Sequence, residues 1–143
     1  MKINIERVDD AYNFKATNET GNVLVMDASP EIGGNNKGYR PMQLLLAAVG
    51  GCSAIDVIQI LKKQKQLITC FDIEVDGTRE KIEEYSLFKN ICLHFKIKGN
   101  VDEVKAHKAI QLSLEKYCSV SKTLEPTAKI SYKLTINDTH NER

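Results

Sequence analysis

The stretch GYRPMQLLLAAVGGCSAIDV, residues 38–57, decides how this sequence folds. Pro41 stands where its fixed backbone angle suits the first turn of a helix. From residue 44 to residue 61 nearly every side chain is apolar, and the polar run 62–66 ends the pattern. We predict a helix over residues 41–65. Because it is apolar on nearly every face, it should be buried on all sides.

Segments of alternating polarity flank this helix. Residues 3–5, 12–16 and 23–26 predict a three-stranded antiparallel meander. Residues 71–76, 91–98 and 130–136 predict half-buried strands, with a second helix over residues 101–117. The polar loop 29–38 reads equally as a plain connector or as the rim of an active site. The order of elements predicts an α+β fold: antiparallel sheets packed around a long buried central helix and a second helix.

The length of the chain limits the number of domains, and its charge excludes some classes of partner. The 143 residues suffice for a single domain, 1–143, and its polar tail, 137–143, should be frayed. The 20 basic and 19 acidic side chains leave a net charge of +1, which gives no electrostatic footprint for nucleic acid or an anionic membrane.

The apolar stretch 44–61 contains Asp56, Gln59 and the pair Gly50-Gly51, so we expect a buried helix and not a membrane span. No secretory signal is recognisable in the first fourteen residues, and we expect a cytoplasmic protein. A monomer of this size has too few elements to cover such a helix, which favours an intertwined homodimer. The two glycines fit a place where another backbone approaches closely.

Four cysteines, none in a CxxC pair, are candidate reactive groups. Cys52 lies within the central helix and Cys118 at the end of the second helix, 66 residues later. On spacing alone both could be buried cysteines without chemistry. Cys70 and Cys92 fall on the polar side of their strands. Cys92 shares a face with His94, but two ligands do not make a site, so we expect no metal and no cofactor. We expect His107 and His140 to be surface residues.

Two motifs resemble one family. Residues 38–57 resemble the signature of the OsmC/Ohr family: a helix-opening Pro, a Leu/Ala-rich turn, and a Cys eleven residues after the Pro. The segment EKYCSVSKTLEP, residues 115–126, resembles that family's second cysteine motif. The run PMQLLLAAVGGC is most similar to the YhfA-like branch.

The resemblance implies a function. Cys52 would attack an organic hydroperoxide and become a sulfenic acid, and Cys118 would resolve it as a disulfide, in defence against oxidative stress. The resemblance also suggests a lipoyl-type dithiol as the reductant. Asp56 lies on the same helix face as Cys52, and we expect it to serve in hydrogen bonding or helix packing.

In an apolar setting Cys52 needs a cation or hydrogen-bond donors to ionise, and three arginines are candidates for the cation. Arg7 lies in the early region from which the family takes its activating Arg. Arg40 is twelve residues before Cys52, about 18 Å along one helix, so it could act only from a partner chain. Arg79 is the third candidate.

One position departs from the family pattern. Hydroperoxide-reducing members carry a Glu after the helix-opening Pro, and here Met42 takes its place. Gln43 follows and could accept a hydrogen bond from an Arg, but without charge. An alternative therefore stays open: a non-catalytic OsmC-like module that binds an apolar or thiol-bearing small molecule. A purely structural dimer is a further alternative.

Overall fold

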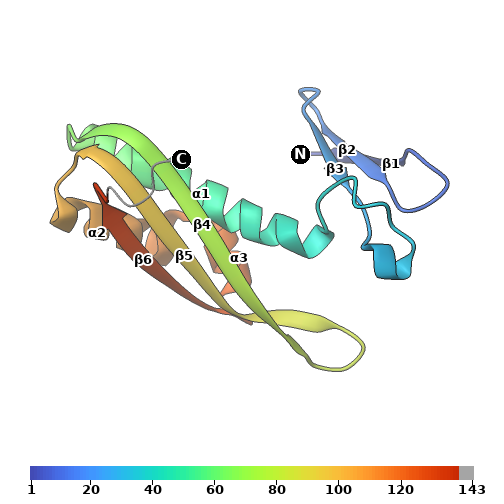
Figure 1. The fold of residues 1–143 in the computed structure, drawn as a ribbon. Coiled ribbons are helices and arrows are strands. Elements are labelled where there is room, and N and C mark those ends of the chain that lie inside the picture. Colours follow the sequence, from blue (N-terminus) through green and yellow to red (C-terminus); the bar gives the residue numbers. More distant parts are fainter. Residues whose placement is uncertain (139–143) are drawn as a thin grey trace. The chain divides into compact units, whose positions relative to one another are not determined.

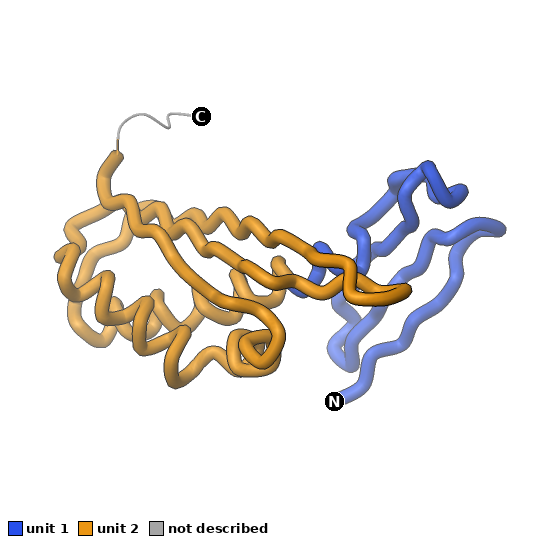
Figure 2. Tube along the Cα trace, turned by 90° about the horizontal axis from the view of Figure 1, so that it is seen from below, with its two compact units in different colours: residues 1–45 blue, residues 46–143 orange. Residues whose placement is uncertain are grey.

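The computed structural model describes residues 1–138 and consists of two compact units, Met1–Leu45 and Leu46–Arg143 (Figure 2). His140 and the tail residues 139–143 lie outside the described residues. At the start of the tail, the Asn137 side chain accepts from the Gly99 N–H at 2.9 Å and donates to the Gly99 carbonyl at 3.0 Å. Fraying of the tail stays a prediction. Whether the two units fold as a single domain stays a prediction.

The first unit contains the predicted meander, with β1 (Ile3–Arg7), β2 (Phe14–Asn18) and β3 (Val23–Met26) antiparallel in that order (Figure 1). The side chain of Asn18 accepts from the N–H groups of Thr20 and Asn22. Gly21 takes a left-handed φ of 86°, which glycine adopts without strain. Local turn chemistry therefore fixes the β2–β3 connection.

Asp27 organises the polar loop that follows β3 and carries the 3₁₀ turn η1 (Pro30–Ile32). Its buried carboxylate accepts the N–H groups of Ala28, Asn35 and Lys37. Burial alone would raise the pKa of Asp27, but these three bonds and the charge of Arg40 hold it below its ordinary value.

Helix α1 (Pro41–Lys63) confirms the predicted central helix to within two residues at its end. The Gln43 side chain accepts the N–H of Arg40 at 3.0 Å and caps the helix start. Beyond the last turn, Lys65 takes a left-handed φ of 57°, and its N–H bonds the carbonyl of Lys62, which closes the helix.

One chain buries only one face of α1, in line with the expectation that a monomer has too few elements to cover the helix on all sides. The buried positions form a single stripe: Val49, Gly50, Ser53, Val57 and Leu61. Ile55, between them, is 60% exposed. By length and composition α1 could cross a membrane, a test that core helices of soluble proteins also pass, and 28% of its most apolar window is buried. The chain has elements enough to cover only one face of it.

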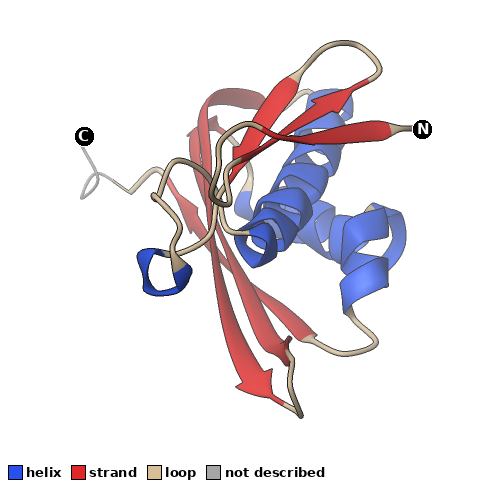
Figure 3. Cartoon of the chain, turned by 90° about the vertical axis from the view of Figure 1, so that its right-hand side faces the viewer, coloured by secondary structure: helices blue, strands red, loops and turns tan. Residues whose placement is uncertain are grey.

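The second sheet has the order β4 (Leu67–Lys81), β5 (Ser86–Asn100) and β6 (Lys129–Ile136). The β4–β5 pair is antiparallel as predicted, but β5 and β6 are parallel, so the prediction of antiparallel strands is wrong for this one pair. The helical crossover between β5 and β6 makes the parallel pairing possible. One face of β5 forms the core, with these residues buried: Phe88, Ile91, Leu93, Phe95 and Ile97. The helices of this unit lie on one face of the sheet (Figures 1 and 3).

The second helix predicted over residues 101–117 is α2 (Glu103–Leu112) continued by the π-helical turn η2 (Ser113–Tyr117). A further short helix, α3 (Ser119–Leu124), follows Cys118 and was not predicted. Helix α2 buries Ala106, Ala109 and Ile110, whereas Val104 is 75% exposed. The extended backbone of Cys118 separates η2 from α3, and its N–H bonds the Ser113 carbonyl at 2.7 Å. This break turns the second cysteine towards α1.

Candidate functional site

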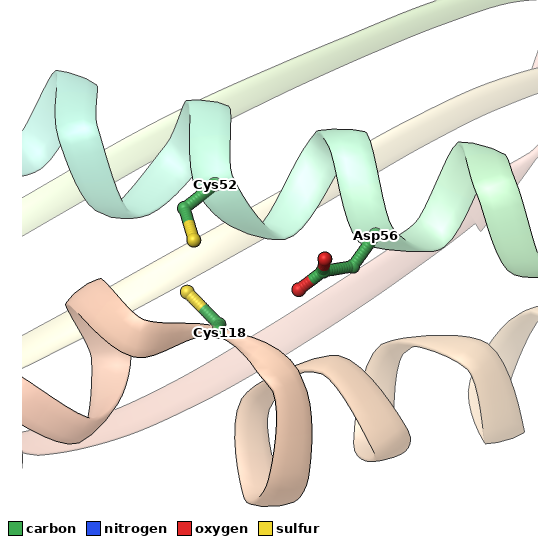
Figure 4. Close-up of side chains that lie close together, drawn as sticks. All are labelled: Cys52, Asp56 and Cys118. Carbon is green, nitrogen blue, oxygen red and sulfur yellow. The ribbon is translucent and has the colours of Figure 1, made fainter.

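The fold brings Cys52 and Cys118 together. Cys52 projects from the middle of α1 and is half-buried, whereas Cys118, at the junction of η2 and α3, is fully buried. Their sulfurs and a carboxylate oxygen of Asp56 all lie within 4.8 Å of one another (Figure 4). Both cysteines are free thiols. The spacing is short enough that a modest movement of either element would bring the sulfurs to bonding distance, about 2.05 Å.

The proton of Cys118 is held tightly. Burial of the thiol, the neighbouring Cys52 and the negative charge of Asp56 raise the pKa of Cys118 to about 11. The N–H of Ser121 acts against this shift, because it donates to the Cys118 sulfur at 3.3 Å and so stabilises a thiolate there. Cys118 is therefore a neutral thiol at neutral pH.

A small polar network fixes Asp56. The Ser113 hydroxyl donates to the Asp56 carboxylate at 2.9 Å and also lies 3.1 Å from the hydroxyl of Ser53. Ser53 and Ser113 are fully buried. The expected hydrogen-bonding role of Asp56 is thus present, but its partner comes from η2, which periodicity does not predict.

Metal-ligand side chains gather only here within residues 1–138, as Cys52, Asp56 and Cys118. A metal ion at these three atoms would have to displace the Cys118 proton, which the raised pKa opposes. Cys92 is half-buried, and its strand neighbour His94 is 2.7 Å from the Thr135 hydroxyl.

Comparison with known proteins identifies the family of this arrangement. The OsmC-like protein family model matches residues 34–133, which include both cysteines. The chain belongs to the OsmC-like family. It is 38% identical to protein YhfA of Escherichia coli over 125 residues, 86% of this chain and 89% of that protein.

Solved structures share the OsmC-like fold. A hypothetical protein from Aquifex aeolicus is 30% identical with a TM-score of 0.78, covering 96% of this chain and 97% of the other. An organic hydroperoxide resistance protein from Elizabethkingia anophelis is 17% identical with a TM-score of 0.72, over 96% and 97% of the two chains. At that identity the second likeness concerns the fold.

The hydrogen-bond partners described for Arg7, Arg40 and Gln43 all belong to the first unit. Arg7 donates to the carbonyls of Asp10 and Ala11 in the loop after β1. The Arg40 guanidinium donates to the Gly38 carbonyl at 3.1 Å and to the Asn36 side chain at 3.0 Å. Gln43 binds the backbone of Arg40 and not its guanidinium. Arg79 is exposed on β4.

Two minor predictions can also be compared with the structure. Cys70 is exposed, as expected from its place on the polar side of β4. His107 is partly exposed but does have a partner, since its ring nitrogen lies 3.1 Å from the Tyr132 hydroxyl. Sequence reasoning missed Ser53 and Ser113. Their one signal in the sequence is that each is a small polar residue in an apolar helix, and such residues require a partner when they are buried.

Proposed function

We propose that this chain reduces organic hydroperoxides through Cys52 and Cys118, in defence against oxidative stress. The observation that carries the proposal is the pairing of a half-buried cysteine with a fully buried one, with their sulfurs within 4.8 Å. Membership of the OsmC-like family supports it, as does the fold shared with an organic hydroperoxide resistance protein.

Cys52 is the peroxidatic residue because it is the more exposed of the two cysteines. Its thiolate attacks the terminal peroxide oxygen, the O–O bond breaks, and the alkoxide leaves and takes a proton to become an alcohol. Cys52 is then a sulfenic acid. The apolar composition of α1 favours an organic hydroperoxide over hydrogen peroxide.

Cys118 is the resolving residue. Its sulfur attacks the Cys52 sulfenic acid, giving a disulfide and water, and so prevents further oxidation of Cys52. A dithiol, of the lipoyl type that the family resemblance suggests, then reduces the disulfide by thiol–disulfide exchange.

Activation of Cys52 requires a cation, and we propose Arg7 or Arg40 for this role. Arg40, which is tied to the polar loop, would act from a partner chain. Gln43 would contribute by holding the backbone of Arg40 in place. With Met42 where hydroperoxide-reducing relatives have Glu, no carboxylate follows Pro41 to hold that cation, so we expect a slower peroxidatic step.

We also propose that the protein is a cytoplasmic homodimer, which does not require nucleic acid or a membrane. Apolar side chains left open in one chain support the dimer. They include Ile55 on α1, 60% exposed, and Ile3 and Ile5 on β1, 56% and 62% exposed. Burying such residues in a second copy removes about 25 cal/mol per Å² of apolar surface from water.

A second candidate function is a binding module for an apolar or thiol-bearing small molecule, with Cys52 as a contact. The observation that favours it is the arginine pairing: both Arg7 and Arg40 donate to backbone carbonyls of the first unit. Native mass spectrometry would detect a bound molecule in that case.

The test is consumption of cumene hydroperoxide with a dihydrolipoyl reductant. Wild type and Cys70→Ser should turn over equally, because the Cys70 sulfur is exposed and pairs with Asp72 at 3.4 Å, away from the proposed reaction. Cys52→Ser should be inactive. Equal activity in Cys52→Ser and wild type would reject the assignment.

A further inference from the structure

Asp56 lies beside both sulfurs, yet the attack of Cys52 on a peroxide does not use it. Its negative charge is unfavourable for a thiolate and contributes to the raised pKa of Cys118. The hydrogen bond from Ser113 does not explain the charge, because a neutral Asn would accept the same bond. A carboxylate at this position therefore suggests that some step of the reaction uses it as a base.

The resolving step supplies such a role. Only a thiolate attacks a sulfenic acid, so Cys118 must lose its proton first. Its side chain is fully buried, which keeps bulk water from accepting that proton. The other polar side chains of the network, Ser53 and Ser113, are hydroxyls and are not bases at neutral pH. Within this cluster, the carboxylate of Asp56 is the group able to accept it.

A place for the resulting thiolate is already present. The N–H of Ser121 donates to the Cys118 sulfur at 3.3 Å, and this hydrogen bond becomes stronger as the sulfur becomes negative. The hydrogen bond from Ser113 holds the Asp56 carboxylate next to the sulfurs. Donor, acceptor and stabilising group are therefore arranged around one proton transfer.

We propose that Asp56 is the proton acceptor for Cys118 when the disulfide forms, and that it passes this proton to the leaving hydroxide. The proposal deepens the proposed function, since that function names the Cys52 sulfenic acid. Cys118 gives its proton to the carboxylate and forms the S–S bond, the S–O bond of Cys52 breaks, and the hydroxide leaves as water. The sulfenic sulfur is reduced, the Cys118 sulfur is oxidised, and Asp56 returns to the carboxylate.

The experiment isolates the attack of Cys118 with the chromogenic disulfide dithiobis-nitrobenzoate, in full-length protein carrying Cys70→Ser and Cys92→Ser. Cys52 attacks the reagent and releases one coloured thiolate, leaving a mixed disulfide. Cys118 then attacks the Cys52 sulfur and releases a second. A further Cys118→Ser change gives the baseline without the second release.

Asp56→Asn should leave the first release within a few-fold of the parent and slow the second by about a hundredfold, the lower end of the range for acid–base catalysis. Asp56→Glu should recover most of the rate. A second release in Asp56→Asn that is unchanged or faster would overturn the proposal, because a carboxylate that merely raises the pKa of Cys118 predicts acceleration on its removal.

Circular dichroism checks folding, and Asp56→Ser is the second variant should Asp56→Asn not fold. Added acetate should accelerate its second release in proportion to concentration, and no acceleration would count against Asp56 as the acceptor. Because the reagent replaces the hydroperoxide, the two proposals fail separately. A protein that reacts with cumene hydroperoxide no faster than an ordinary free thiol, but depends on Asp56 in the second release, would refute the peroxidase alone.

Discussion

The adjacent glycines of α1 give a matched test of how this helix meets the sheet. A Cβ added to Gly50 would lie 2.8 Å from Val75 Cγ2, whereas a Cβ added to Gly51 meets nothing within 4 Å. Replacing Gly by Ala inside a helix stabilises it by about 1 kcal/mol at either position. At Gly50 the overlap with Val75 adds an overpacking cost of about 1–3 kcal/mol.

We therefore expect Gly51→Ala to raise the free energy of unfolding by about 1 kcal/mol. Gly50→Ala should lower it by about 1 kcal/mol, since the overpacking cost exceeds the helix gain. Urea unfolding followed by circular dichroism measures both at one protein concentration, because a dimer's stability depends on concentration. Equal stabilisation by both changes would show that α1 does not approach β4 as described. The position described for Cys52, two residues after Gly50 on the same helix, would then also be wrong.

Three further predictions concern the charges and thiols. Iodoacetamide at neutral pH should alkylate Cys118 much more slowly than exposed Cys70, because the Cys118 sulfur is buried and its pKa, raised from 9.0 to about 11, leaves little thiolate to react. Equal rates by peptide mass mapping would contradict the burial. Because folding raises the pKa of Cys118, the protonated thiol contributes stability that is fully present below pH 9 and is lost as the pH rises towards 11. Over that range the free energy of unfolding should therefore fall more steeply in the wild type than in Cys118→Ser. Asp27→Asn should lower the free energy of unfolding at neutral pH, and the gap between variant and wild type should shrink in strong acid. The reason is that the lowered pKa of Asp27 stabilises the fold above the unfolded-state pKa, and this effect is lost as the carboxylate protonates. A gap independent of pH would assign the effect to packing.

Periodicity predicted the elements whose pattern is local. The Pro-led apolar run gave α1, and alternation gave the six strands to within a few residues, except that β4 and β5 are longer than predicted. The parallel pairing of β6 with β5 was missed, because strand direction is set by tertiary packing. The second helix ends before Cys118 as predicted, but helix α3 beyond it was missed, and so were the hydrogen bonds that Ser113 and Ser121 make with Cys118.

The candidate site was predictable in part. Helical spacing alone placed Asp56 on the face of Cys52, four residues on. The meeting of Cys52 with Cys118 spans 66 residues, so no local rule gives it, and it followed from the resemblance to a family. Ser113 could not be found, since it reaches Asp56 from a π-helical turn whose geometry the sequence pattern does not show.

The central claim, that the two cysteines act as a pair, is tested most directly by intact mass after one equivalent of cumene hydroperoxide. The reduced wild type should rapidly lose two hydrogens, Cys52→Ser should show no fast reaction, and Cys118→Ser should gain oxygen on Cys52. A wild type that reacts no faster than an ordinary free thiol, or that gains oxygen without forming the Cys52–Cys118 disulfide, would contradict it.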